Sequence, residues 1–197
     1  TQVFSYQGSI DTIMSPLDSI RYQKSFLRVG FMSMDPNTGH VKAYVGGPDF
    51  THFQYDMASV GRRQIGSTVK PFLYTLAMEE GFTPCDMFLN EQPTLITEDG
   101  KPWSPRNSSK ARVGEMVSLR WGLANSNNWI SARLMDKLSP SSLARLMHSF
   151  GIKNKIDEVI SLCLGPVEVS VEEMVTAYTA FSNKGVRVDP LYVTRIE

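Results

Sequence analysis

The sequence GSTVKPF at residues 66–72 places Ser67 three residues before Lys70, with Pro71 suited to the first turn of a helix. We expect that helix to start near Ser67 or Thr68 and to run towards Gly81. Residues three apart share a helix face. A serine becomes a good nucleophile beside a base, and lysine acts as a base when burial or a helix N-terminus lowers its pKa.

The S-x-x-K spacing therefore predicts an activated serine nucleophile. Serine and lysine are common residues, so about one chance S-x-x-K is expected in a chain of this length. The motif needs support from the rest of the sequence.

Composition predicts an ordinary globular domain, or a large piece of one. The 197 residues are 42% hydrophobic and 20% charged, with zero formal net charge, which argues against nucleic acid or an anionic membrane surface as a partner. The three histidines have no ligand spacing, so we expect no metal and no cofactor. Cys85 and Cys163 are predicted to be buried free thiols. We find no apolar run long enough to span a membrane.

The first half of the chain predicts a β-hairpin, then a helix, then a long irregular segment. Residues 1–25 are weakly patterned and are predicted to be a linker. Alternating residues over 26–34 and 40–45 flank a turn at 35–39. Residues 82–115 are rich in Pro, Asn, Gly and Ser, and excursions of that length often form functional walls or lids.

The second half is predicted to be mostly helical. Ser139-Pro140 and a capping box at Ser170 each mark a helix start. The order of elements indicates an α+β fold, with an antiparallel sheet packed with helices and a mostly helical lobe. Helices are expected over 119–124, 129–138, 140–150 and from 170 to about 183, the last with Val171, Met174, Val175, Tyr178 and Phe181 facing the core.

Ser126-Asn127-Asn128 lies on the predicted loop between two of these helices. A hydroxyl there could carry a proton between Lys70 and a leaving amine, and a carboxamide could bind the backbone of a peptide substrate. The alternative is that these residues only cap the two helices, because Asn and Ser prefer such positions.

Together, these motifs resemble the transpeptidase domain of penicillin-binding proteins, which carries S-x-x-K, an S-x-N element and K-T-G. The lead-in Arg62–Phe72 looks like the bifunctional, class A branch. The hairpin residues 35–43 and 45–47, the segment 162–165 and the stretches 169–178 and 183–187 are also similar to the family. The resemblance covers roughly residues 10–197.

The resemblance implies roles for four residues. Ser67 is the acylated nucleophile, Lys70 is its general base, Ser126 relays the proton and Asn128 binds the substrate amide. It also implies acyl transfer from D-Ala-D-Ala stem peptides, cross-link formation, and inhibition by β-lactams. The domain division it implies is a linker at 1–25, from an upstream region, followed by the N-terminal and central part of the transpeptidase domain at 26–197.

One departure from the family pattern is that no Lys-Thr-Gly occurs in the chain. We expect the fold to stop before the final strands, and this piece to be inactive alone for that reason. The resemblance further implies a membrane-anchored parent protein with an upstream glycosyltransferase domain. Such a protein would lie in the bacterial cell envelope, on the outer face of the cytoplasmic membrane, with cell-wall assembly proteins as possible partners.

Two alternative functions stay open at this point. A D,D-carboxypeptidase or β-lactamase would share Ser67, Lys70 and Ser126 but pass the acyl group to water. A non-catalytic β-lactam sensor or assembly scaffold would not transfer it at all. Acylation by a β-lactam and transfer to an amine separate these possibilities from a transpeptidase.

Overall fold

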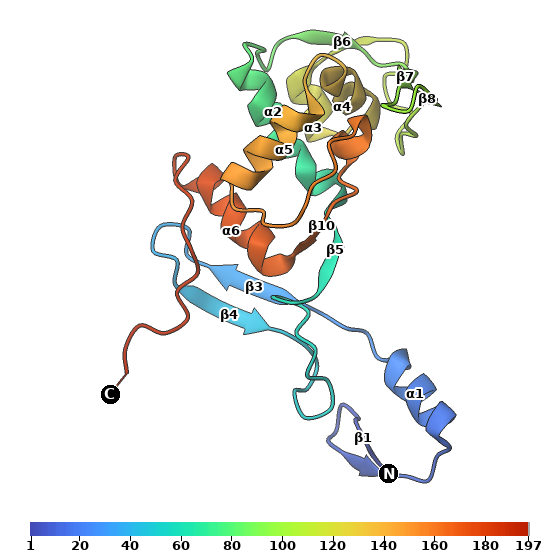
Figure 1. Cartoon of the computed structure of the whole chain (residues 1–197), viewed down its shortest axis with the longest axis vertical. Helices are drawn as coiled ribbons and strands as arrows, with labels where there is room; N and C mark the ends of the chain where they lie inside the picture. Colours follow the sequence, from blue (N-terminus) through green and yellow to red (C-terminus); the bar gives the residue numbers. More distant parts are fainter. Residues whose placement is uncertain (197) are drawn as a thin grey trace. The chain divides into compact units, whose positions relative to one another are not determined.

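A computed structural model describes residues 1–196, and the chain forms two compact units. The first unit contains residues 1–62 together with those from Ser170 onward, and the second contains residues 63–169 (Figure 1). The chain passes between the units within β5 (Arg62–Gln64) and at the end of β10 (Glu168–Ser170), two short strands that pair with each other.

The first unit is built around the predicted hairpin. Strands β3 (Phe31–Met34) and β4 (Val41–Val45) pair antiparallel, with Phe31 opposite Val45. The Asp35 carboxylate closes the turn by accepting the backbone N–H groups of Asn37 and Thr38 at 2.8 and 3.1 Å. The helix α6 (Val171–Ser182) packs against β3. The hairpin prediction is confirmed, although its first strand begins at Phe31 rather than at residue 26.

Residues 1–25 hold more structure than the predicted linker. Strands β1 (Gln2–Val3) and β2 (Ile10–Asp11) form a small antiparallel pair, and α1 (Pro16–Ser25) follows. The Ser15 side chain caps α1 by accepting the N–H of Asp18. No residue of α1 is buried, and its two apolar residues at helical spacing, Leu17 and Ile20, are exposed.

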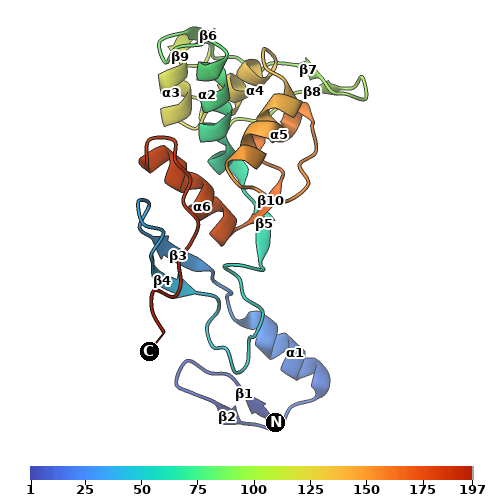
Figure 2. The ribbon, with the colours of Figure 1, turned by 60° about the vertical axis from the view of Figure 1, so that its left-hand side comes forward.

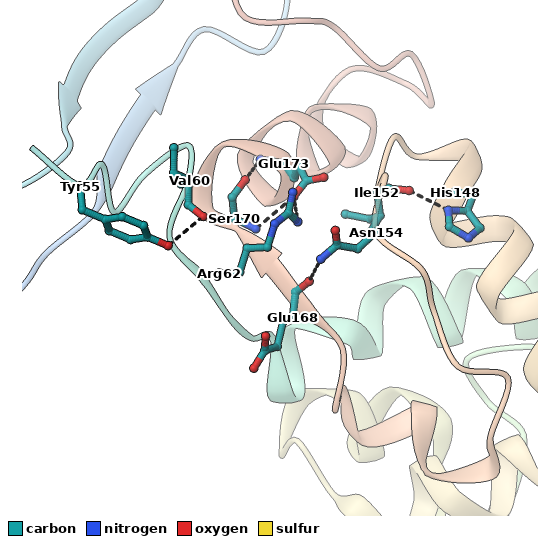
Figure 3. A network of polar contacts seen from close by, with 9 residues as sticks. All are labelled: Tyr55, Val60, Arg62, His148, Ile152, Asn154, Glu168, Ser170 and Glu173. Carbon is teal, nitrogen blue, oxygen red and sulfur yellow. Dashed lines mark hydrogen bonds and ion pairs between the residues drawn. The ribbon is translucent and has the colours of Figure 1, made fainter.

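The capping box at the start of α6 is confirmed, and Figure 3 shows it from close by. Ser170 Oγ accepts the N–H of Glu173, whose carboxylate accepts the N–H of Ser170 and also binds Arg62 at 2.7 Å. The predicted core face of α6 is wrong, since its buried residues are Thr176, Ala177, Thr179 and Ala180. These small side chains let the following segment return across them, where Val188 donates its N–H to Thr179 Oγ1.

The second unit is mostly helical and centres on α2 (Lys70–Glu79). Figure 2 shows α3, α4 and α5 grouped around it. The buried side chains of Phe72, Leu73 and Leu76 on α2 form its core with Leu143 and Met147 of α5. The other elements are η1 (Gly66–Val69), α3 (Leu119–Ala124), α4 (Asn128–Met135), α5 (Pro140–Ser149) and η2 (Ile160–Leu164).

The long segment between α2 and α3 is irregular, as predicted, but it contains two short antiparallel strand pairs. Strand β6 (Met87–Leu89) pairs with β9 (Met116–Ser118), and β7 (Leu95–Ile96) pairs with β8 (Pro102–Trp103). Residues 104–115, between β8 and β9, contain no helix or strand. They run alongside the start of α4, which they contact through side-chain hydrogen bonds.

The α+β prediction is confirmed, because helices and small antiparallel sheets share the described part of the chain. The cysteine prediction is half right: Cys163 is buried and free, whereas Cys85 is free but exposed. Within residues 1–196, no helix combines the length and apolar character needed to cross a bilayer.

Candidate active site

Ser67 lies on η1, a 3-10 turn that leads directly into α2. The α-helix starts two or three residues later than predicted, at Lys70, whose backbone N–H donates to the carbonyl of Ser67. Ser67 is exposed, and Pro71 occupies the first turn of α2 as expected. The serine is thus presented to solvent next to the positive end of a ten-residue helix.

A second backbone segment, at residues 165–167, holds this turn through hydrogen bonds. Gly66 donates its N–H to Gly165, and Ile65 donates its N–H to Val167, both at 3.0 Å. Gly165 has a φ of +71°, and a Cβ added there would lie 2.2 Å from the carbonyl oxygen of Gly66. Only glycine fits that conformation and that approach, so Gly165 sets the position of the residue before Ser67.

Lys70 connects the two predicted motifs. Its side chain is only 1% exposed, and its Nζ donates to Ser126 Oγ at 3.0 Å, to the Ser126 carbonyl at 2.6 Å and to Asn128 Oδ1 at 2.7 Å. Three acceptors match the three donors of an ammonium group. The fold therefore brings Ser126 and Asn128, which follow Lys70 by 56 and 58 positions in the sequence, into contact with its amine.

The backbone at Ser126 is adapted to this contact. Ser126 has a φ of +49°, in the left-handed region that non-glycine residues rarely adopt. Its hydroxyl and its carbonyl both reach Lys70 in that conformation. Such backbone strain gathers at functional sites, where the surrounding contacts hold it in place.

Burial lowers the pKa of Lys70 from 10.5 to about 8. The opposing influence comes from Cys163 on η2, whose own pKa burial raises to about 12. Tyr74, one helical turn after Lys70, also has its pKa raised to about 12 by burial. Both neighbours are therefore uncharged near neutral pH, and the buried Lys70 amine has neutral groups around it.

Asn128 is held by the irregular segment that precedes α3. Its Nδ2 donates to the carbonyl of Arg106 at 2.8 Å, and its backbone N–H donates to Asn107 Oδ1 at 3.1 Å. The indole N–H of Trp129 donates to the Pro105 carbonyl at 3.0 Å, which places Trp129 as a loop-packing residue. Residues 105–107 thus lie directly against the first turn of α4.

A buried pair of asparagines, Asn90 and Asn127, also joins the start of α4 to the irregular segment before α3. Asn127 is the N-cap of α4, and its Nδ2 donates to Asn90 Oδ1 at 2.9 Å. Asn90 is fully buried and donates to the carbonyls of Ala111 and Arg112, both at 2.9 Å. Because the amide groups of this pair are hydrogen-bonded at both ends, the pair fixes the loop that carries Ser126.

Three of the four predicted site residues are in direct contact, and the fourth lies on the adjoining turn. Within residues 1–196, the Ser67 hydroxyl makes no hydrogen bond to Lys70 or Ser126. Catalytic hydrogen bonds often tighten only when substrate is bound. The sequence interpretation missed Gly165, Asn90 and Asn107, although the Asn-rich and Pro-rich composition of 82–115 had marked that segment as functional.

Comparison with known proteins agrees with this geometry. Residues 29–197 match the family described as "Penicillin binding protein transpeptidase domain", and residues 1–27 match "Penicillin-binding protein middle domain". Penicillin-binding protein 2D of Bacillus subtilis is 34% identical over 173 residues, which cover 87% of this chain and 25% of that protein. Penicillin-binding protein 1A of Escherichia coli is 35% identical over 169 residues, covering 84% and 20%.

Solved structures show the same likeness. The crystal structure of penicillin-binding protein 1A from Haemophilus influenzae has a TM-score of 0.77 and 29% identity, covering 82% of this chain and 24% of that one. The structure of PonA1, a penicillin-binding protein from Mycobacterium tuberculosis, has a TM-score of 0.70 and 26% identity, covering 82% and 44%.

The chain belongs to the penicillin-binding protein transpeptidase family, which confirms the resemblance found in the sequence. Relatives named penicillin-binding protein 1A agree with the prediction of the class A branch. The chain spans a fifth to a quarter of the length of the curated relatives that it matches.

Proposed function

We propose that this chain supplies the acylation site of a peptidoglycan D,D-transpeptidase, with Ser67 as nucleophile and Lys70 as general base. The observation that supports this most strongly is the contact of Lys70 with Ser126 and Asn128, beside the turn that bears Ser67. It joins the S-x-x-K and S-x-N motifs at one buried amine, as a proton relay requires.

The reaction begins when Ser67 Oγ attacks the carbonyl carbon of the penultimate D-Ala of a stem peptide. Its proton passes to neutral Lys70, and the new Oγ–C bond gives a tetrahedral intermediate. The C–N bond then breaks, and the terminal D-Ala amine takes a proton that Lys70 returns through the Ser126 hydroxyl. An amine from a neighbouring stem attacks the resulting ester, forms the cross-link and releases the Ser67 hydroxyl.

The environment of Lys70 makes the first step feasible near neutral pH. With a pKa of about 8, about a quarter of the lysines are neutral at pH 7.5, against about one in a thousand at the ordinary value. The Ser67 N–H lies in the first turn of η1, where backbone donors have no intrahelical partner. That N–H supplies one donor of an oxyanion hole, a kind of interaction typically worth several kcal/mol.

The parent protein is, on the same reasoning, a bifunctional enzyme of the class A type. It would carry a glycosyltransferase domain and a membrane anchor, and would act at the outer face of the cytoplasmic membrane. Its relatives named penicillin-binding protein 1A support this assignment. Stem peptides and β-lactams are the expected ligands, and cell-wall assembly proteins are the expected partners.

The test is turnover of a stem pentapeptide with an added amine acceptor, followed by mass spectrometry of the products. The complete protein that carries these residues should yield the cross-linked product and free D-Ala, and Ser67→Ala should yield neither. D-Ala release without cross-linked product would favour a carboxypeptidase. Release that survives in Ser67→Ala would contradict the assignment of the nucleophile.

A further inference from the structure

The carboxamide of Asn128 has two chemically different ends, and the structure fixes which one faces Lys70. Its Oδ1 accepts from Lys70 Nζ at 2.7 Å, and its Nδ2 donates to the Arg106 carbonyl at 2.8 Å. Rotation by half a turn would set an N–H against the lysine amine and an oxygen against a carbonyl oxygen. Both contacts therefore select the same orientation independently.

The position of the Arg106 carbonyl depends in turn on the next residue, Asn107. Asn107 Oδ1 accepts the backbone N–H of Asn128 at 3.1 Å, and its Nδ2 donates to the Ser109 carbonyl at 2.9 Å. The N–H of Asn128 lies in the first turn of α4, so it has no partner within the helix. The half-buried Asn107 side chain thus ties residues 106–109 to the start of α4.

We propose that Asn107 is a positioning residue for acyl transfer, which holds the Arg106 carbonyl against Asn128 and so keeps the carboxamide oxygen on Lys70. This inference rests on the proposed function of Ser67 and Lys70. Asn107 acts through Asn128 and has no contact with the reacting atoms. Its effect is on how readily Lys70 takes up and returns the proton.

Two substitutions at Asn107 separate this role from a structural one, because they act on Lys70 in different ways. Asn107→Ala removes the acceptor for the Asn128 N–H and frees the carboxamide to turn. Asn107→Asp keeps an acceptor oxygen for the Asn128 N–H, but it loses the Nδ2 bond to the Ser109 carbonyl and adds a negative charge. The other groups around Lys70 are uncharged near neutral pH: Cys163 on η2, Tyr74 on α2, and the amide and hydroxyl of the α3–α4 loop. The exposed Arg106 guanidinium is present in every variant.

The measurement is the second-order rate constant for acylation by benzylpenicillin, from pH 6 to 10, in the complete protein that carries these residues. The acid limb of this profile reports the pKa of the general base in the free enzyme. Rate constants are taken per active site, titrated by the stoichiometry of the adduct, so that any misfolded fraction is removed from the comparison. Ser67→Ala is measured alongside. Asn183→Ala, which removes a single Nδ2 bond to the Val186 carbonyl in the first unit, is the matched control.

We expect Asn107→Ala to lower the acylation rate constant about tenfold or more, because a tenfold change corresponds to about 1.4 kcal/mol, the size of one hydrogen bond. We expect Asn107→Asp to retain more of the alkaline rate, with its acid limb moved upward by about half a pH unit or more. Asn183→Ala should match the wild type.

Wild-type rate constants and an unmoved acid limb in both Asn107 variants would overturn the proposal. So would a fall in titrated sites alone, with the rate per site unchanged, because that is the mark of a purely structural residue. These outcomes differ from acylation that survives in Ser67→Ala, which would instead contradict the proposed function.

Discussion

Gly165→Ala should damage the nucleophile from a distance, because the methyl group would meet the backbone that precedes Ser67. The new Cβ would lie 2.2 Å from the Gly66 carbonyl oxygen and 2.8 Å from its nitrogen. Real Cβ contacts are not shorter than 3.0 Å, so the two segments must separate by about 0.8 Å at the least. Such a separation strains the bond from the Gly66 N–H to Gly165, and with it the neighbouring bond from Ile65 to Val167.

The size of the effect follows from these contacts. A left-handed alanine costs about 1–2 kcal/mol, and each strained backbone bond adds about 1 kcal/mol. A nucleophile displaced by about 1 Å loses on the order of a hundredfold in rate. We therefore expect Gly165→Ala to lower the free energy of unfolding by about 3 kcal/mol and the penicillin acylation rate by ten- to a hundredfold.

Gly100→Ala is the matched control for this substitution. Gly100 has a φ of +74°, close to that of Gly165, yet nothing lies within 4 Å of its Cβ position. It should show the conformational cost of about 1–2 kcal/mol without the loss of acylation. Urea denaturation and the acylation rate, measured on both variants, would refute the reasoning if Gly165→Ala behaved like Gly100→Ala.

Three further predictions concern stability. Between pH 7 and 10, Lys70 should raise the free energy of unfolding of the wild type by about 2.5 kcal/mol, because the unfolded state binds more protons than a folded state whose Lys70 pKa is about 8. Lys70→Met should abolish this rise in urea denaturation. An equal pH dependence in the two proteins would contradict the prediction. Asn90→Ala should cost about 3 kcal/mol in the same assay, since it removes the partner of the buried Asn127 amide and the bonds to the Ala111 and Arg112 carbonyls. An unchanged midpoint would count against the asparagine pair. Ser170→Ala should cost about 1 kcal/mol through loss of the α6 cap, seen as faster amide exchange in the first turn of that helix; exchange at the wild-type rate would argue against the cap.

The helix starts show what local sequence can and cannot predict. Ser139-Pro140 predicts a helix start because Leu143, Leu146 and Met147 follow it at helical spacing, and Leu143 and Met147 are buried in α5. Ser15-Pro16 has the same signature, and its serine makes the capping bond that Ser139 does not make. Only Leu17 and Ile20 follow this cap at helical spacing, which is too short an apolar pattern to predict a helix, and both side chains are exposed.

The candidate site divides in the same way. The S-x-x-K and S-x-N spacings predicted Ser67, Lys70, Ser126 and Asn128, since each motif is local in the sequence. Asn107 contacts Asn128 from 21 positions earlier in the sequence, and Gly165 contacts Gly66 from 99 positions later. Only the fold creates these contacts, so local spacing could not predict them. Composition marked the segment 82–115 as functional but could not say which carbonyl or amide in it meets the site.

The most direct test of the central claim is intact mass after incubation with penicillin, followed by peptide mapping of the adduct. It should be run on this chain and on a protein extended beyond residue 197, each with a Ser67→Ala control. The account predicts one penicilloyl group per extended protein, located on Ser67 and absent from the control. No adduct on the extended protein, or an adduct that maps elsewhere and persists in Ser67→Ala, would contradict it.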